Sequence, residues 1–210
     1  MAIELNSLEE ALSRALELSN NATKRLIIGI VGKPGAGKST LSSYLMEHLP
    51  REITALVPMD GYHLSNLQLA NLGRSNRKGA PDTFDVFGFT ELIKRIKTDL
   101  DNDIYFPIFH REIEESIAAE GVVHSNTKIV LTEGNYLLHS GDGWGNIASL
   151  LNECWFVEVD DELRLERLVN RHIAYGKEPK FAHDWAHGTD ERNAELVAKS
   201  KDKASVIVNL

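Results

Sequence analysis

One short string constrains this chain more than any other feature. Residues 32–39 read Gly-Lys-Pro-Gly-Ala-Gly-Lys-Ser, which fits the pattern G-x-x-x-x-G-K-[ST]. The continuous apolar run Leu26–Val31 precedes the string and is typical of a strand buried on both faces. After it, Leu41, Leu45 and Leu49 recur every four residues, as in an amphipathic helix. Strand, glycine-rich turn and helix is the context that distinguishes a phosphate-binding loop (P-loop) from a chance match.

This P-loop predicts a binding site for a nucleoside triphosphate, ATP, together with Mg²⁺. Glycines allow successive backbone N–H groups to converge on phosphate oxygens, and the helix N-terminus adds partial positive charge. The Lys38 ammonium can reach the β- and γ-phosphates, and the Ser39 hydroxyl can bind Mg²⁺. The residues expected to bind ATP from this segment are Gly32, Lys33, Pro34, Gly35, Ala36, Gly37, Lys38, Ser39 and Thr40.

The length and charge of the chain narrow the class of protein. A chain of 210 residues suits one α/β domain, so we expect residues 1–210 to form a single domain. A net charge of −8 argues against a nucleic acid as the main partner, because a polyanion would be repelled. Basic residues cluster locally between residues 74 and 78 and between residues 164 and 180. Such clusters suit a small phosphorylated ligand better than a nucleic-acid track.

The chain carries no sequence signal for export or for a membrane. Cys154 is the only cysteine, so an intrachain disulfide is excluded. The first twenty residues lack a signal-peptide apolar core, and no apolar run approaches membrane-spanning length. We therefore expect a cytoplasmic protein with no membrane partner.

Short apolar strands alternate with helical patterns along the chain, which predicts a parallel sheet with crossover helices. Strands are expected near residues 26–31, 53–57, 128–132, 154–159 and 204–208. Helices are expected near residues 7–18 and 40–49, from Thr90 through Leu100, from 161, and from 189 or 190. Residues 64–90 read as an ordered loop, and residues 104–109 with 121–124 as short strands or a hairpin. The expected fold is α/β, with a three-layer α/β/α arrangement.

Two carboxylates follow predicted strands at the sheet edge where ligands bind in open α/β folds. Asp60 follows the strand near 53–57, and Glu133 follows the strand near 128–132. A carboxylate beside Mg²⁺·ATP can accept a proton from an attacking hydroxyl or hold the metal. Position favours Asp60 for the proton and Glu133 for the metal, with a turn or capping role as the alternative.

The helix expected from residue 161 presents three arginines on one face, at i, i+3 and i+7: Arg164, Arg167 and Arg171. The helical pattern then breaks from Gly176 to Gly188. Two helices around a mobile loop indicate a lid, at about residues 164–190, whose guanidinium groups stabilise charge on the transferred phosphoryl group. The alternative is that the arginines form salt bridges with Glu162 and Glu166 along the helix.

Several further strings resemble, in the expected order, the phosphoribulokinase/uridine kinase family of P-loop kinases. Residues 60–64 resemble its D-G-F-H segment, and residues 77–85 resemble an R-[KR]-G-x-P-x-x-[FY]-D signature shared with bacterial pantothenate kinases. Residues 133–138 resemble the E-G-N-Y-L-L of a fructose transport system kinase or nucleoside kinase-like subgroup. Arg171-His172 and the segment from Gly176 to Asn193 resemble that subgroup's lid and following helix. The match runs from about residue 10 to the C-terminus.

This resemblance implies a kinase that transfers the γ-phosphate of ATP to a hydroxyl of a small metabolite such as a nucleoside, pantothenate or a sugar. It implies Asp60 as the base, Lys38 and Ser39 at the phosphates and Mg²⁺, and Glu133 at the metal. Arg171 would be catalytic from the lid, where Arg167 would also bind ATP. The residues expected to bind the acceptor are Asp60, His63, Arg77, Lys78, Asp85, His110, Arg111, Asn135 and Tyr136.

The chain departs from the subgroup pattern at one position, and the sequence leaves two alternative functions. Residues 109–112 read Phe-His-Arg-Glu where the subgroup has aromatic-Asp-Arg-Glu, so His110 replaces a carboxylate and puts the usual acceptors in question. The rivals are a switch or assembly ATPase without a small-molecule acceptor, and a catalytically weak ligand sensor. Related kinases often pair through surface helices, so a homodimer is also open, although no coiled-coil heptad indicates one.

Overall fold

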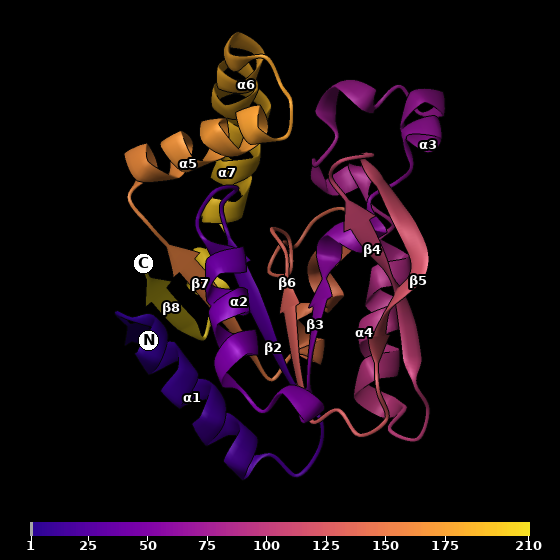
Figure 1. The fold of residues 1–210 in the computed structure, drawn as a ribbon, viewed down its shortest axis with the longest axis vertical. Helices are drawn as coiled ribbons and strands as arrows, with labels where there is room; N and C mark the ends of the chain where they lie inside the picture. Colours follow the sequence, from indigo (N-terminus) through magenta and orange to yellow (C-terminus); the bar gives the residue numbers. More distant parts are fainter. Residues whose placement is uncertain (1) are drawn as a thin grey trace.

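A six-stranded parallel sheet forms the centre of the protein in the computed structural model, which describes residues 2–210 (Figure 1). From one edge to the other the strands are β1 (Ile3–Leu5), β8 (Val206–Asn209), β7 (Glu153–Glu158), β2 (Leu26–Gly32), β6 (Ile129–Glu133) and β3 (Thr54–Pro58). Every neighbouring pair is parallel. Strand β2, which leads into the P-loop, therefore has a strand on each side, and the carboxyl ends of β6 and β3 lie beside the loop.

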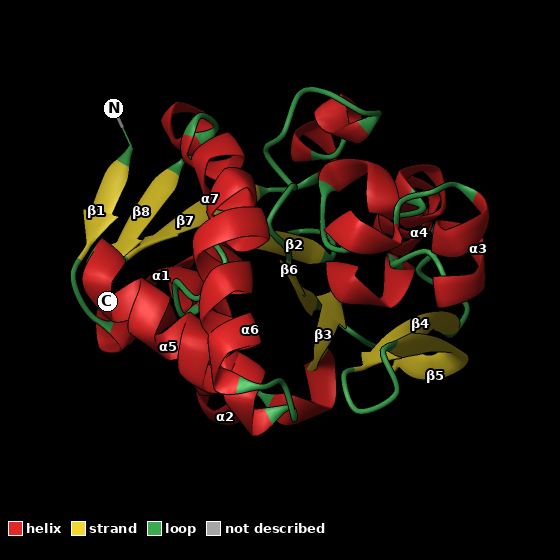
Figure 2. Ribbon diagram, turned by 90° about the horizontal axis from the view of Figure 1, so that it is seen from above, coloured by secondary structure: helices red, strands yellow, loops and turns green. Residues whose placement is uncertain are grey.

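Helices cover both faces of this sheet, which confirms the expected three-layer P-loop fold (Figure 2). They are α1 (Leu8–Asn21), α2 (Lys38–His48), α3 (Asn66–Asn71), α4 (Val86–Thr98), α5 (Asp161–Ala174), α6 (Pro179–Trp185) and α7 (Glu191–Ala198). One core lies between the sheet and α1 with α2, and the other between the sheet and α4 with α7. Among residues 2–210, no helix has the length and apolarity needed to cross a bilayer.

Strand β2 shows how the sequence produces the two cores. Side chains alternate across a strand, so Leu26, Ile28 and Ile30 enter the core beneath α1 and α2, and Ile27 and Val31 enter the opposite core. All five are at most 2% exposed. Burial of each such side chain contributes about 1.5–3 kcal/mol, so the strand holds the P-loop on a rigid base.

The expected hairpin is confirmed, and it is longer than the sequence indicated. Strand β4 (Ile104–His110) pairs antiparallel with β5 (Glu115–Val123), beside the β3 edge of the main sheet (Figure 1). Only Val123 of β5 is buried, and the strand lacks an apolar run from which it could be recognised in the sequence.

The helix after the loop region starts earlier than expected. Helix α4 begins at Val86, and the Asp85 carboxylate accepts a hydrogen bond from the Gly88 N–H at 2.9 Å, which makes Asp85 the N-cap. Thr90, the expected cap, is buried inside the helix and donates its hydroxyl to the Val86 carbonyl. The prediction of a Thr90 cap is therefore wrong. The sequence also gave no sign of β1, because three residues carry too little pattern.

The predicted interruption of the lid between Gly176 and Gly188 is also wrong over most of its length. Gly176, at φ +85°, follows the end of α5, and α6 starts three residues later with Pro179 at its first position. A π-helical segment, Ala186–Asp190, joins α6 to α7. Gly188 fits within this segment, where an added Cβ would meet no atom within 4 Å. The segment predicted to be a lid consequently consists of two helical arms joined by a short turn.

Candidate active site

The P-loop links β2 to α2 with two residues in the left-handed region. Gly35 has φ +83° and Gly37 has φ +95°, conformations that side chains other than glycine rarely adopt. Gly37 is the N-cap of α2 and makes no side-chain capping hydrogen bond, so the first N–H groups of the helix remain available to a ligand. An 11-residue helix thus points its positive end into the loop.

Lys38 folds back over this loop. Its ammonium donates to the carbonyls of Gly32 at 2.9 Å and Lys33 at 3.1 Å. Burial lowers the pKa of Lys38 to about 8, and the nearby charge of Glu133 partly opposes this shift. A phosphate would offer the ammonium a stronger, charged partner than the two carbonyls.

Glu133, at the end of β6, lies beside the first turn of α2. One carboxylate oxygen accepts from the Ser39 hydroxyl at 3.2 Å, and the other from Ser42 at 2.7 Å. A hydroxyl and a carboxylate are hard oxygen ligands of the kind Mg²⁺ takes, alongside phosphate oxygens and water. The residues present therefore fit Mg²⁺. Ser42 was not expected here, although its i+3 spacing from Ser39 on the helix could have indicated it.

Asp60 follows β3 and lies across from the P-loop. Its carboxylate accepts from an Arg111 N–H at 2.7 Å, and its main-chain carbonyl accepts from His63 Nδ1 at 2.8 Å. Burial acts to raise the pKa of Asp60, but His63, Arg111, Lys38 and Arg171 together lower it below the ordinary value. The carboxylate is thus ionised. Burial lowers the pKa of His63, and because Nδ1 donates to a carbonyl, the neutral ring has Nε2 free as an acceptor.

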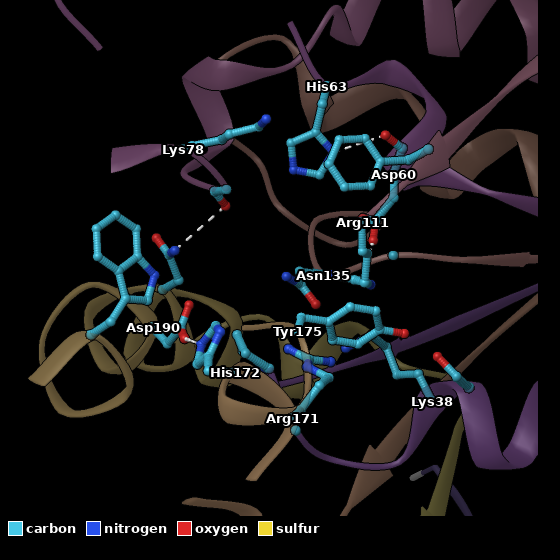
Figure 3. Close-up of a pocket in the computed structure, with 18 of the residues that line it drawn as sticks. Lys38, Asp60, His63, Lys78, Arg111, Asn135, Arg171, His172, Tyr175 and Asp190 are labelled. Atoms are coloured by element: carbon cyan, nitrogen blue, oxygen red, sulfur yellow. Dashed lines mark hydrogen bonds and ion pairs between the residues drawn. The ribbon is translucent and has the colours of Figure 1, made fainter. Parts of the chain in front are cut away.

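These groups line one cavity of about 750 Å³ (Figure 3). The P-loop, the segments after β3 and β6, the hairpin turn and the lid each contribute to its wall. The sequence-predicted residues that line it are Pro34, Gly35, Gly37, Lys38, Ser39, Thr40, Asp60, His63, Lys78, Arg111, Glu133, Asn135, Arg167 and Arg171. In Figure 3, Asp60, His63 and Arg111 face Arg171 and Tyr175 across the space, with Asn135 between the two groups.

The remaining P-loop residues lie behind this wall. The carbonyls of Gly32 and Lys33 hold Lys38, and the Ala36 side chain is buried in the core. The Lys33 side chain turns away from the cavity and pairs with Asp161 at 2.9 Å. Only the main chain of Lys33 is therefore available to a ligand in the loop.

Four residues expected to bind the acceptor lie outside the cavity lining. Asp85 is used as the α4 cap, and Arg77 pairs with Asp82 at 2.7 Å. Tyr136 is fully buried and donates its hydroxyl to the Gly79 carbonyl. The fourth, His110, lies on the exposed hairpin, where it bonds to two glutamates. Each finds a partner elsewhere, which a linear motif could not indicate.

The structure also adds cavity residues that were absent from the predicted site. His172 and Asp190 bond at 2.6 Å and join α5 to the π-helical segment. Asn193 of α7 donates to the Gly79 carbonyl at 3.4 Å. The further lining residues are Ser75, Gly79, Phe84, Phe109, Glu114, Gly134, Tyr175, Lys177, Phe181 and Trp185. Phe181 and Trp185 lie four residues apart on α6 with their rings stacked, a spacing that could have indicated a helix where a loop was expected.

No family model matches the chain, but individual proteins do. A Schizosaccharomyces pombe protein provisionally named a uridine kinase is 31% identical over 183 residues, which span 83% of this chain and 77% of that protein. An Aspergillus versicolor protein named as ATP-dependent kinase-like is 33% identical over 152 residues, 68% of this chain and 88% of that protein. The names of these relatives support a phosphotransferase that uses ATP.

A solved structure extends the match to the whole fold. A crystal structure provisionally named a fructose transport system kinase, from Silicibacter sp. TM1040, is 32% identical and superposes with a TM-score of 0.85. The superposition covers 96% of this chain and 98% of that one. With the P-loop and the parallel sheet in place, the resemblance found in the sequence is confirmed: the chain belongs to the uridine kinase-like family of P-loop kinases.

Proposed function

We propose that the protein transfers the γ-phosphoryl group of ATP to a hydroxyl group of a small metabolite. One observation carries the proposal: the ionised carboxylate of Asp60 and the P-loop open onto the same cavity. A base and a phosphate site on opposite sides of one space are what a transfer to a bound hydroxyl requires.

Asp60 is the proposed general base. Arg111 holds one carboxylate oxygen at 2.7 Å, which leaves the other oxygen free to accept a proton from the acceptor hydroxyl. As the hydroxyl oxygen bonds to the γ-phosphorus, the bond from that phosphorus to the β–γ bridging oxygen breaks and ADP leaves. The pKa of Asp60 is lowered, so the base is ready across the neutral range.

The phosphate side is proposed to consist of Lys38, the α2 N-terminus, and Arg167 with Arg171 from the lid. These positive groups compensate the charge that develops on the transferred phosphoryl group. Ser39 and Glu133 would hold Mg²⁺, which supplies charge neutralisation at the β- and γ-phosphates when bound.

The acceptor remains open among a nucleoside, pantothenate and a sugar. Relatives are provisionally named for uridine and for fructose transport, which supports two of these three. The acceptor side offers the free Nε2 of His63 and the amide of Asn135. The His63 ring packs between two aromatic rings, with centroid distances of 4.1 Å to Phe84 and 4.5 Å to Phe109. His110 lies outside the cavity, so its departure from the subgroup pattern gives no reason to exclude the usual acceptors.

The test is ADP release from Mg²⁺·ATP with and without a panel of alcohols that includes uridine, pantothenate and fructose. Release that an acceptor stimulates, with an equal yield of phosphorylated product, supports the kinase. Turnover that no acceptor changes would favour a switch or assembly ATPase. Nucleotide and acceptor binding without turnover would favour a sensor.

A further inference from the structure

Arg164 forms a buried junction between three segments of the chain. Its side chain is 1% exposed, and its guanidinium donates to one acceptor on each segment. The partners are the Pro34 carbonyl of the P-loop at 3.3 Å, Asp161 at the start of α5 at 2.7 Å, and Glu191 of α7 at 2.5 Å. Arg164 is not a cavity residue, so the proposed chemistry does not account for it.

Two further contacts tie the same junction to the P-loop. An added Cβ on Gly35 would lie 2.7 Å from the Arg164 carbonyl oxygen, so the loop and α5 are packed backbone to backbone. On the outer side, Lys33 of the loop pairs with Asp161, which also accepts from Arg164. A shift of the P-loop therefore cannot occur without changing contacts of α5.

The other end of the junction leads to the cavity wall. Glu191 begins α7, directly after the π-helical segment that carries Asp190. Asp190 bonds to His172, and Asn193 of α7 bonds to the Gly79 carbonyl on the opposite side of the cavity. The helix held by Arg164 thus positions lid residues at the acceptor side.

We propose that Arg164 is a positioning residue that transmits occupancy of the P-loop by nucleotide to the lid. Lys38 donates to the carbonyls of Gly32 and Lys33, next to Pro34, so a phosphate that draws the ammonium toward itself changes the contacts beside Pro34. The planar guanidinium fixes the geometry of its three partners, so a displaced Pro34 carbonyl shifts its pairing with Glu191. Burying a charge is costly, and a site that used it only for packing would favour an apolar residue. This inference rests on nucleotide binding at the P-loop, as in the proposed function.

Trp185 provides the readout. It lies on α6 at the cavity, with the Lys177 ammonium 4.9 Å from its ring, whereas Trp144 and Trp155 are fully buried in the cores. Its emission should therefore change when a non-hydrolysable ATP analogue with Mg²⁺ binds, and Trp185→Phe should remove that change. No acceptor is needed, so the test does not depend on the identity of the substrate.

The decisive variant is Glu191→Gln, which keeps the shape of the side chain and removes its charge. We expect the analogue Kd from calorimetry to stay within about threefold of the wild-type value, while the Trp185 response falls by at least about half. Glu191→Asp should recover part of the response. The matched control is Glu195→Gln, an exposed glutamate of the same helix, which should behave as wild type. Arg164→Lys, with one ammonium in place of the fork, should lose the response as well.

The outcomes separate this inference from the proposed function. A full Trp185 response in Glu191→Gln, or a silent Trp185 in wild-type protein that binds the analogue, overturns the role of Arg164 and leaves the kinase intact. Failure of the wild-type protein to bind the analogue overturns both. Loss of the response with retained analogue affinity, confined to the junction variants, supports the proposal.

Discussion

The two sides of the cavity are built in different ways. The proposed nucleotide side comes mainly from the backbone of one continuous segment, residues 32–40, between a strand and a helix. The proposed acceptor side is assembled from side chains of the turn after β3, the loop before α4, the hairpin and the predicted lid. Backbone geometry follows from a short motif, whereas side-chain convergence depends on packing between distant segments. The sequence motif therefore predicts ATP, whereas the acceptor depends on contacts that no motif specifies.

The largest effect should come from Asp60→Asn, which tests whether the base on the acceptor side acts on a hydroxyl held beside the nucleotide side. The amide cannot accept the hydroxyl proton, so kcat should fall by about 10²–10⁴-fold. Calorimetry should show analogue binding close to the wild-type value, because the P-loop is unchanged. Wild-type turnover in this variant would remove Asp60 from the chemistry and separate the two sides functionally.

Gly35→Ala tests whether the nucleotide side depends on its backbone. The φ of +83° strains any other residue by about 1–2 kcal/mol, and the new Cβ would also meet the Arg164 carbonyl at 2.7 Å. Analogue affinity should fall by about tenfold or more. The matched control is Gly73→Ala, with φ +65° and no atom within 4 Å of the added Cβ. If both variants bind the analogue equally well, close packing of the loop is unimportant.

The pH dependence of nucleotide binding should come from Lys38. Its pKa is about 8 in the free protein, so the ammonium is present below that pH and is lost as the pH rises through it. Analogue affinity should be constant below about pH 8 and then fall by up to about tenfold per pH unit. Lys38→Arg keeps its charge, so its affinity should show no such decline in calorimetry. A decline that survives in Lys38→Arg would assign the titration to another group.

The contrast between a backbone site and a side-chain site also limits what could be predicted from the sequence. The pattern of strand, turn and helix located the P-loop in the sequence. The ends of the predicted strands located Asp60 and Glu133 at the carboxyl edge of the sheet, where the structure has them. Spacing put Arg164 and Arg171 on one helix face, but seven residues of helix span about 10 Å. Arg164 therefore meets the P-loop from behind, and Arg171 reaches the cavity. Both arginines lie on the same face of α5, but their separation along the helix axis gives them different surroundings.

Side chains recruited by neighbouring segments could not be predicted from motifs. Tyr136 follows Asn135 directly, yet Asn135 enters the cavity and Tyr136 enters the core. Asp85 belongs to a string that matches a family signature, but the start of α4 claims its carboxylate. The partners of both residues come from packing and local capping, which a pattern of residue types does not specify.

Tyr136→Phe should have a modest effect on the acceptor side. It removes a hydrogen bond to the Gly79 carbonyl, so unfolding free energy should fall by about 1 kcal/mol in urea titrations. Gly79 lines the cavity, so loss of this hydrogen bond should loosen the acceptor side and raise acceptor KM a few-fold. The Gly79 carbonyl keeps its contact with Asn193, so kcat and analogue affinity should be unchanged. Tyr105→Phe, at a 60% exposed tyrosine, is the control. A lowered analogue affinity would show that the two sides are not separable here.

The smallest effect on activity should come from His110→Asp, which installs the residue that the subgroup pattern has at this position. His110 bonds to Glu112 at 2.8 Å and Glu120 at 2.6 Å on the exposed hairpin, outside the cavity lining. Activity across the acceptor panel should therefore stay within about twofold of wild type, an effect near the limit of free-energy measurements. A changed order of acceptors would mean that the hairpin reaches the acceptor during turnover.

The stability of the same variant should depend on pH in a defined direction. Hydrogen bonds to Glu112 and Glu120 raise the pKa of His110, so the folded protein holds its proton more tightly than the unfolded chain. The stabilisation is complete below the unfolded pKa, about 6.5, and is lost as the pH rises through the folded pKa. Urea midpoints should thus differ more between wild type and His110→Asp at about pH 5.5 than at about pH 9. Equal differences at both pH values would show that the pair with the two glutamates does not form, and that the hairpin is held by its strands alone.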